Sequence, residues 1–490
     1  MAEDAAPRAE IGPRRLLAAV GLTGSAALLS VALGVATTKV IAMVAGPAGI
    51  AVMGLYRYAG ALVSRSLLLG LDTTVVQRIS TAKDPKDVSN TVGAAALALV
   101  FQGVAIAVLA GIGAGLIGAW LFGTAATRLQ LVEIRVVLAM AYANLVMQVM
   151  TAVLSGRAEV RKVAWVGVAA AVVTLMAIYP LLQLGNVGLA LNVGSGSTVG
   201  AALATFYVWR VYRPAWVPGS LGERFRALSA VLARSFFLIV HPIVMMSAVV
   251  SVQSLVFGRF ELAGLGAYNA AMTLLDTALM VMMASARSFF LPTLGQLDGH
   301  EDKAGAVNRV LRINLILAFA TTLVTIAGAP VLIRVLFSND FATTERILPA
   351  FSLALVGQAF VWTYAMFYLH RARYRLFFSL DLFWAALYVG GTLIVTSRSG
   401  SLTAAAWVYA GSYCLSGIAY AFVAVRAFGM AMLDNANVRL GAFALLGALG
   451  ACLAHELGSW QLDLAVMSFG LAILGRELRR TLSEARGETA

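Results

Sequence analysis

The sequence has few charged residues, almost no cysteine and almost no histidine. Only 12% of its 490 residues are Asp, Glu, Lys or Arg, whereas an ordinary soluble domain carries about 25%. Cys414 and Cys452 both lie in apolar runs, where a free thiol acts as a small hydrophobic group. Four scattered histidines provide no metal-ligand spacing, and HELGS at His455 lacks the second histidine of a zinc motif. A soluble domain, a disulfide framework and a metal centre are therefore excluded.

Long polar segments are also missing. The connections between apolar runs are short, so none can fold as a catalytic domain outside a membrane. GSGST at Gly194 resembles a phosphate-binding loop but lacks its lysine, and it lies in an apolar run. We therefore expect no enzyme and no resident cofactor.

What the sequence does have is a succession of long apolar runs. Hydrophobic residues make up 60% of the chain and the mean hydropathy is +0.86. Runs of 20 or more residues can each cross about 30 Å of hydrocarbon as a helix. The sequence predicts an all-α integral membrane protein with about fourteen transmembrane helices. They are expected near 15–45, 49–77, 90–121, 131–155, 163–184, 188–212, 227–257, 264–292, 306–337, 345–370, 377–397, 402–427, 438–457 and 462–476.

The net charge of +13 reflects membrane orientation, and no nucleic-acid partner is expected. Most of the 36 Lys and Arg lie in the N-terminal arm, in alternate connections and in the tail. Under the positive-inside rule those connections face the cytoplasm. Both termini are then cytoplasmic, and the protein crosses the membrane many times.

Weak internal similarity suggests two related halves. Spans one and two, joined at GPAG, resemble spans seven and eight, joined at GRFELAG, in length and glycine placement. We expect two six-helix lobes followed by two further helices. The divisions are a cytoplasmic arm (1–14), an N-lobe (15–212), an inter-lobe cytoplasmic loop (213–226), a C-lobe (227–427), helices 13 and 14 (438–476) and a cytoplasmic tail (477–490).

Four charged residues, Lys39, Arg57, Arg65 and Asp72, lie inside the first two spans. A charge at the bilayer centre costs roughly 2.5–3.5 kcal/mol, so such residues face a polar interior or extend to the interface. Lys39 and Arg57 are near enough to the outer turn for either reading, whereas Arg65 is too deep to reach an interface easily. On a continuous helix Arg65 and Asp72 would share one face, within about 20°.

Span eight repeats this pattern, because Asn269, Asp276 and Arg287 recur on one narrow helical face. Asp276 is close to the midplane, where an acid is a candidate counter-ion to Arg65 or a proton carrier. A neutral or paired packing acid is the alternative. Arg234, near the inner end of span seven, either extends a basic vestibule or anchors the interface.

These segments also resemble a known family. KVIAMVAGPAGIAVMGLYRYAGALV is similar to the first hairpin of Wzx-type lipid-linked oligosaccharide flippases, with its lysine, glycine-proline turn and aromatic-Arg pair. AYNAAMTLLDTALMVMMASARSFFLPTLGQL resembles that family's eighth helix, and VLFSNDFATTERILPAFSL and LLQLGNVGLALNVGSG extend the likeness. By position, Lys39 matches the family's lysine, Tyr56 and Arg57 its aromatic-Arg pair, and Asp276 its acid. Arg65 and Asp72 have no counterpart.

The resemblance implies two lobes in a V around a cationic cavity that opens alternately to each side of a bacterial inner membrane. It implies transport of undecaprenyl-pyrophosphate oligosaccharide for O-antigen or a related surface polysaccharide, alongside a polysaccharide polymerase and a chain-length regulator. The resemblance implies that Lys39 and Arg57 bind the pyrophosphate. From their positions in the spans we also expect Arg65, Arg287 and Arg234 to bind it, with Tyr56 and Asn269 as further polar groups. Asp72 and Asp276 would serve as counter-ions or couple transport to protons or Na+. A lipid II or drug exporter of the same fold, and an integral-membrane glycan transferase or polymerase, remain alternatives.

Overall fold

The structure of the protein is a computed structural model. It describes residues 13–82, 84–122, 127–212, 220–232, 236–296 and 300–458, with short pieces between 461 and 479. Every regular element in these residues is helical. The predicted all-α membrane architecture is thus confirmed.

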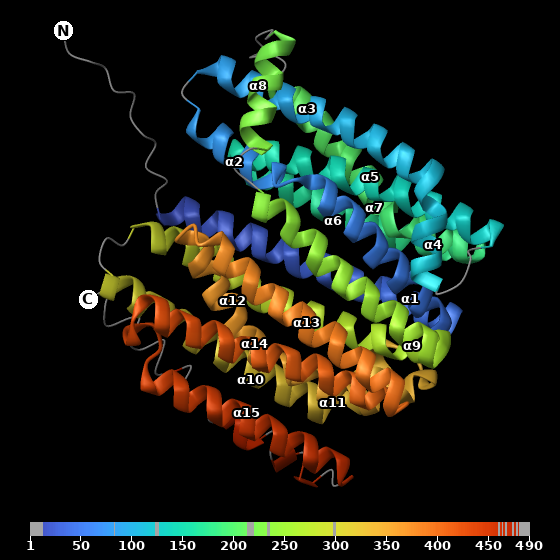
Figure 1. The fold of residues 1–490 in the computed structure, drawn as a ribbon, viewed down its shortest axis with the longest axis vertical. Coiled ribbons are helices and arrows are strands. Elements are labelled where there is room, and N and C mark those ends of the chain that lie inside the picture. Colours follow the sequence, from blue (N-terminus) through green and yellow to red (C-terminus); the bar gives the residue numbers. More distant parts are fainter. Residues whose placement is uncertain are drawn as a thin grey trace.

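The first half of the chain begins with a helix that doubles back on itself. Helix α1 (Pro13–Leu68) leaves helical geometry at Gly46, with φ 61° and ψ −160°, a conformation open mainly to glycine. The chain runs to one end of the molecule and returns (Figure 1). The remaining elements are α2 (Leu71–Thr81), α3 (Pro85–Val108), a π-helical turn (Leu109–Gly113), α4 (Ala114–Phe122), α5 (Arg128–Gly156), α6 (Val160–Leu182) and α7 (Gly185–Tyr212).

A short amphipathic helix, α8 (Leu221–Leu232), connects the two halves in the sequence and packs against α3. Lys86 Nζ lies 3.0 Å from Glu223 Oε1 across this contact. Ser220 and Glu223 also cap the helix reciprocally, through bonds of 3.0 and 3.2 Å between backbone N–H and side chain. Hydrogen bonding from Lys86 holds the pKa of the Glu223 carboxyl below its usual value.

The second half repeats the doubled helix. Helix α9 (Phe236–Gln296) departs from helical geometry at Glu261, with φ 56° and ψ −167°. The segments Asn339–Ser352 and Ala354–His370 meet at a bend of 44°. The remaining elements are α10 (His300–Leu336), a 3-10 turn (Asn339–Phe341), α11 (Ala342–Ser352), α12 (Ala354–His370), α13 (Tyr374–Arg398), α14 (Leu402–Phe428), a 3-10 turn (Met430–Met432) and α15 (Asn435–Glu456).

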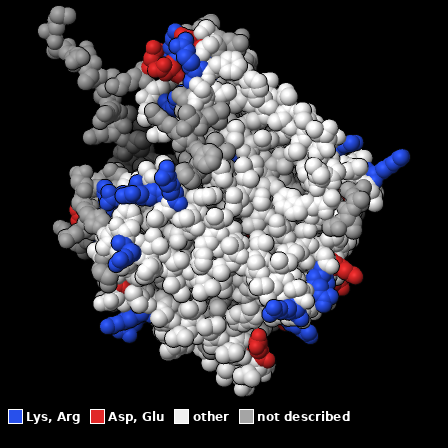
Figure 2. Space-filling model, in the orientation of Figure 1, with Lys and Arg blue, Asp and Glu red and all other residues white. Residues whose placement is uncertain are grey.

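The helices are arranged for a membrane. The described part of the chain contains ten helices that are long and apolar enough to cross a bilayer, or eleven if the bent pair is counted as one span. Helices α1 and α9 each contain two of the spans predicted from the sequence. This agrees with about fourteen spans, although the last, 462–476, falls largely outside the described residues. On the face in Figure 2, charged residues gather at the two ends of the helices and leave an uncharged band between them. The chain is a multi-pass membrane protein.

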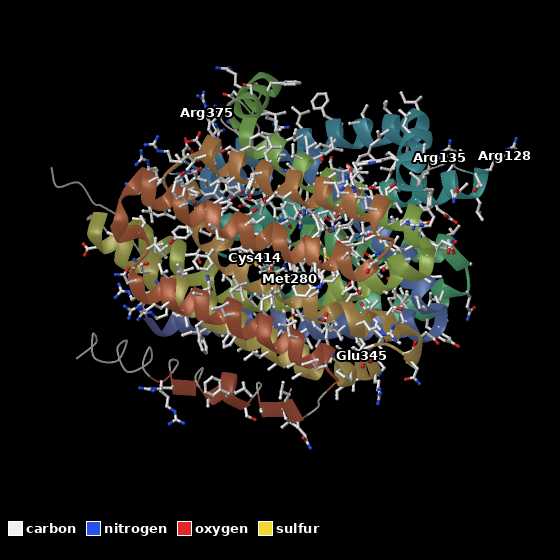
Figure 3. The ribbon with its side chains drawn as sticks, turned by 60° about the horizontal axis from the view of Figure 1, so that its bottom comes forward. Arg128, Arg135, Met280, Glu345, Arg375 and Cys414 are labelled. Carbon is white, nitrogen blue, oxygen red and sulfur yellow. The ribbon has the colours of Figure 1, made fainter. Side chains whose placement is uncertain are left out.

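The two ends can be followed by individual residues. In Figure 3, Arg128, Arg135 and Glu345 lie toward one end of the helices and Arg375 toward the other, with Met280 and Cys414 between them. The turns of α1 and α9 lie at the end that carries Arg128. We call this the hairpin end.

The helices form two groups, α1–α7 and α9–α14, which meet where α1 packs against α9. This contact is close because glycines remove side chains from it. A Cβ at Gly54 would lie 2.1 Å from Asn269 Nδ2, and one at Gly266 only 2.0 Å from the Pro47 carbonyl oxygen. Helix α15 packs outside the second group, chiefly on α10.

Candidate functional site

A cavity of about 260 Å³, lined by both polar and apolar residues, lies where the two groups of helices meet. Both segments of α1 contribute to it, together with α6, α7 and the second segment of α9. Along α1 and α9 it lies on the hairpin side of Arg57 and Asp276. Its lining residues are Gly34, Thr37, Thr38, Ile41, Ile50, Met53, Gly54, Arg57, Ala171, Thr174, Asn192, Val193, Asn269 and Thr273.

The charged centre of the site is an ion pair between the two groups of helices. Arg57 Nη2 on α1 lies 3.8 Å from Asp276 Oδ2 on α9. The two side chains keep 40% and 42% of their surface exposed. An ion pair that is long and partly open to solvent contributes little to stability, so each partner can exchange for another ligand.

Tyr58 completes this centre, and sequence reasoning had missed it. Its hydroxyl accepts a hydrogen bond from Arg57 Nη2 at 3.1 Å and donates to Asp276 Oδ2 at 3.2 Å. The Arg57 guanidinium also lies 5.0 Å from the centre of the Tyr58 ring, within range of a cation–π contact. The signal was available in the Arg-Tyr pair of LYRYAG. Tyr58 therefore holds both charged groups in place.

Arg65 lies farther from the hairpin end, on the same segment of α1. Eight residues separate it from Arg57, a rise of about 12 Å along a helix. Its side chain is exposed, and its charge acts electrostatically on Asp276. Arg57 and Arg65 thus lie on the same helical segment at two different depths.

The helix that carries Arg65 does not continue to Asp72, contrary to the expectation from helical phase. Leu69 and Gly70 adopt positive φ angles of 53° and 71°, so α1 ends at Leu68 and α2 begins at Leu71. Asp72 lies in the first turn of α2, where the helix dipole favours a negative charge. The argument that Arg65 and Asp72 share one face is therefore wrong.

Tyr56 is not part of the cavity lining, although it precedes Arg57. It is 1% exposed and donates a hydrogen bond to Glu133 Oε2 on α5, itself 1% exposed. Successive residues on a helix point about 100° apart. Tyr56 therefore fixes α1 to α5 within the first group of helices, while Arg57 points toward the second group.

We expect Tyr56→Phe to destabilise the protein by about 1–3 kcal/mol, because a buried acceptor would lose its donor. The change can be measured as a shift in the thermal unfolding midpoint of the detergent-solubilised protein. Tyr179→Phe, at an exposed tyrosine, provides the control. Equal midpoints for wild type and Tyr56→Phe would contradict a stabilising role for this bond.

Two hydrogen bonds join the two groups of helices near the hairpin end. Lys39 Nζ donates to the Val335 carbonyl oxygen of α10 at 2.5 Å. Ser254 Oγ on α9 donates to the Trp120 carbonyl oxygen of α4 at 2.7 Å. Lys39, expected to bind ligand, thus takes part in closing this end.

The other predicted site residues differ in how far the structure describes them. Asn269 is 1% exposed, lines the cavity and places its Nδ2 atom 3.5 Å from the Ala51 carbonyl oxygen. Arg234 lies outside the described residues, and so does the side chain of Arg287. Within the described part of the chain, no group of three or more His, Cys, Asp or Glu could hold a metal ion.

Comparison with known proteins places this geometry in a recognised architecture. No protein-family model and no curated protein matches the chain. Among solved structures, the lipid II flippase MurJ in an inward closed conformation aligns at a TM-score of 0.70 with 12% identity, over 95% of this chain and 99% of that one. An inward-facing MATE multidrug resistance transporter of the MOP superfamily aligns at 0.65 with 14% identity, over 84% and 98%.

A MOP superfamily transporter from Pyrococcus furiosus, described as having a binding pocket of reversed polarity, aligns at 0.62 with 15% identity, over 85% and 96% of the two chains. Structural alignments of this quality show a shared architecture, whereas identities this low do not show what the protein transports. The chain has the fold of the MOP-superfamily transporters.

Proposed function

We propose that the protein is an alternating-access flippase that moves a pyrophosphate-linked glycolipid from the cytoplasmic to the periplasmic leaflet of a bacterial inner membrane. The observation that carries the proposal is the partly exposed Arg57–Asp276 pair at the edge of the cavity between the two groups of helices. An undecaprenyl-pyrophosphate oligosaccharide fits this chemistry, since its lipid stays in the bilayer while its charged head must cross it.

The ion pair supplies a mechanism for binding and release. A pyrophosphate oxygen can replace Asp276 on Arg57 through short, charge-assisted hydrogen bonds. Arg65, about 12 Å away along the helix, provides an earlier contact for the same group. Asp276, freed from Arg57, can take up a proton or a Na+ ion, and its return to Arg57 would displace the ligand. This exchange links cargo release to the coupling ion.

Contacts at the hairpin end support a direction of opening. Lys39 and Ser254 join the two groups there, whereas Arg57 and Arg65 remain accessible. With the positive-inside orientation, the described conformation would receive its ligand from the cytoplasm. Opening the hairpin end would then release the head to the periplasm, to a polysaccharide polymerase and its chain-length regulator.

Lipid II is the second candidate, favoured by the alignment with the lipid II flippase. It carries the same pyrophosphate, so Arg57 and Arg65 would serve both lipids alike. A cationic drug fits less well, because the one carboxylate described at the cavity edge is already paired with an arginine. A glycan transferase or polymerase would need catalytic groups placed around a bound acceptor, and the described lining offers one arginine and otherwise uncharged residues.

The test is transport by the purified protein in liposomes. Fluorescent undecaprenyl-pyrophosphate glycan is placed in both leaflets, and the fraction exposed to an external quencher is followed over time. We expect protein-dependent exchange between leaflets with no change in the lipid's mass. Fluorescent lipid II serves as the competing cargo. Exchange no faster than in protein-free liposomes, or an altered mass, would overturn the proposal.

A further inference from the structure

We propose that the cavity on the hairpin side of Arg57 is a subsite for one neutral sugar, the residue attached directly to the ligand's pyrophosphate. This inference rests on the proposed function and adds the orientation of the head. The sugar enters first, toward the closed hairpin end, and the pyrophosphate stays at Arg57.

The lining of the cavity combines threonine hydroxyls and asparagine amides with apolar side chains, and it is nearly uncharged. Among the described residues that line it, Arg57 alone is charged, and none carries a carboxylate or an aromatic ring. A cation would find no counter-ion there, and a polyprenyl chain would leave the polar groups without partners. A neutral, hydroxyl-bearing group matches the lining.

Two buried hydrogen-bond acceptors lie in the wall of this space, one from each group of helices. Asn192 and Asn269 are 0% and 1% exposed, and the side-chain oxygen of each lacks a hydrogen-bond partner in the described structure. Their amide nitrogens already donate, to the Thr174 and Ala51 carbonyl oxygens. Buried acceptors without a donor are unfavourable. Both oxygens are covered in this structure, so a sugar hydroxyl would supply the missing donor once the asparagine side chain turns toward the cavity.

The threonine hydroxyls of the cavity are also available mainly as hydrogen-bond acceptors. Each donates its hydroxyl proton to a carbonyl oxygen one turn back on its own helix, at 2.8–3.0 Å. The hydroxyl oxygens therefore keep lone pairs that can accept from a ligand, although Thr273 Oγ1 already accepts from Arg57 Nη2 at 3.5 Å. The four residues are Thr37, Thr38, Thr174 and Thr273.

The volume limits what can be held. About 260 Å³ is just below the range of roughly 300–1,000 Å³ usual for drug-sized ligands. It suits one sugar ring better than a whole repeat unit. Because Arg57 belongs to the same lining, that ring must be the one next to the pyrophosphate.

The experiment compares two lipids on two variants. Affinity is measured for undecaprenyl pyrophosphate and for the same lipid carrying one N-acetylhexosamine, with protein in nanodiscs. Wild type should bind the sugar-bearing lipid at least fivefold more tightly. The double variant Thr38→Val/Thr174→Val, which keeps side-chain shape but removes two acceptors, should bind both lipids equally. Arg57→Ala should weaken binding of both.

A matched control is Thr396→Val, because Thr396 also donates to its own helix, at 2.8 Å, but lies in α13 away from the cavity. It should keep the wild-type preference. If wild type binds both lipids equally, or the double variant keeps the preference, the sugar subsite is wrong and the pyrophosphate site stands. If neither lipid binds, or Arg57→Ala changes nothing, the proposed function itself fails.

Discussion

Arg57→Ala is expected to slow translocation of the pyrophosphate-linked lipid by roughly ten- to a hundredfold while the protein stays folded. Hydrogen bonds to a charged group contribute about 1.5–3 kcal/mol, and 1.4 kcal/mol corresponds to a factor of ten. The lost ion pair, with about two-fifths of each side chain exposed, should cost no more than about 1 kcal/mol of stability. The liposome exchange assay measures the first effect and thermal unfolding the second.

Two further variants separate charge from geometry. Arg57→Lys keeps the charge but loses the planar fork that binds phosphate through two hydrogen bonds, so we expect an intermediate rate. Arg398→Ala removes an exposed cation at the end of α13 and should leave the rate unchanged. If Arg57→Ala transports at the wild-type rate, Arg57 has no part in the mechanism.

Gly266→Ala should open the hairpin end of the molecule. Its new Cβ would lie 2.0 Å from the Pro47 carbonyl oxygen, where ordinary contacts are 3.4–4 Å. Because that neighbour is backbone, α9 must move away from the turn of α1. We expect spin labels at Val44 and Val331, both exposed on their helices, to separate by several ångströms as the closed population falls.

The control for this change lies on the same doubled helix. A Cβ at Gly258 would meet no atom within 4 Å, so Gly258→Ala should keep the wild-type distance distribution. Both variants require a background in which Cys414 and Cys452 are replaced. An unchanged distribution in Gly266→Ala would show that the close approach to Pro47 does not control opening.

The fold could be predicted largely from the sequence because the bilayer imposes a simple rule. Every backbone group in hydrocarbon must be hydrogen-bonded, so long apolar runs become helices. The same reasoning identified Arg57 and Asp276 as costly charges that needed a polar setting. It did not identify their partners correctly, since helical phase gives a face and not the residue on another helix. The sequence predicts Asp276 as a candidate counter-ion to Arg65 or a proton carrier; in the structure its ion pair is with Arg57, and Arg65 acts on it from farther away.

Other errors have local causes. The apolar run predicts one continuous helix through Arg65 and Asp72, yet Leu69 and Gly70 adopt positive φ angles and together end the helix. Tyr56 was grouped with Arg57 through a shared motif, although neighbours on a helix point in different directions. Its partner Glu133 comes from a distant helix, and nothing in the sequence pairs them.

The cavity is unequally shared between the two groups of helices. Only Asn269 and Thr273 come from α9, and all other lining residues belong to α1, α6 and α7. A head bound there would keep its place relative to the first group while the second group swings past it. The bound head group would then stay attached to the first group of helices. The second group would only need to move away so that the head group becomes accessible from the opposite side of the membrane.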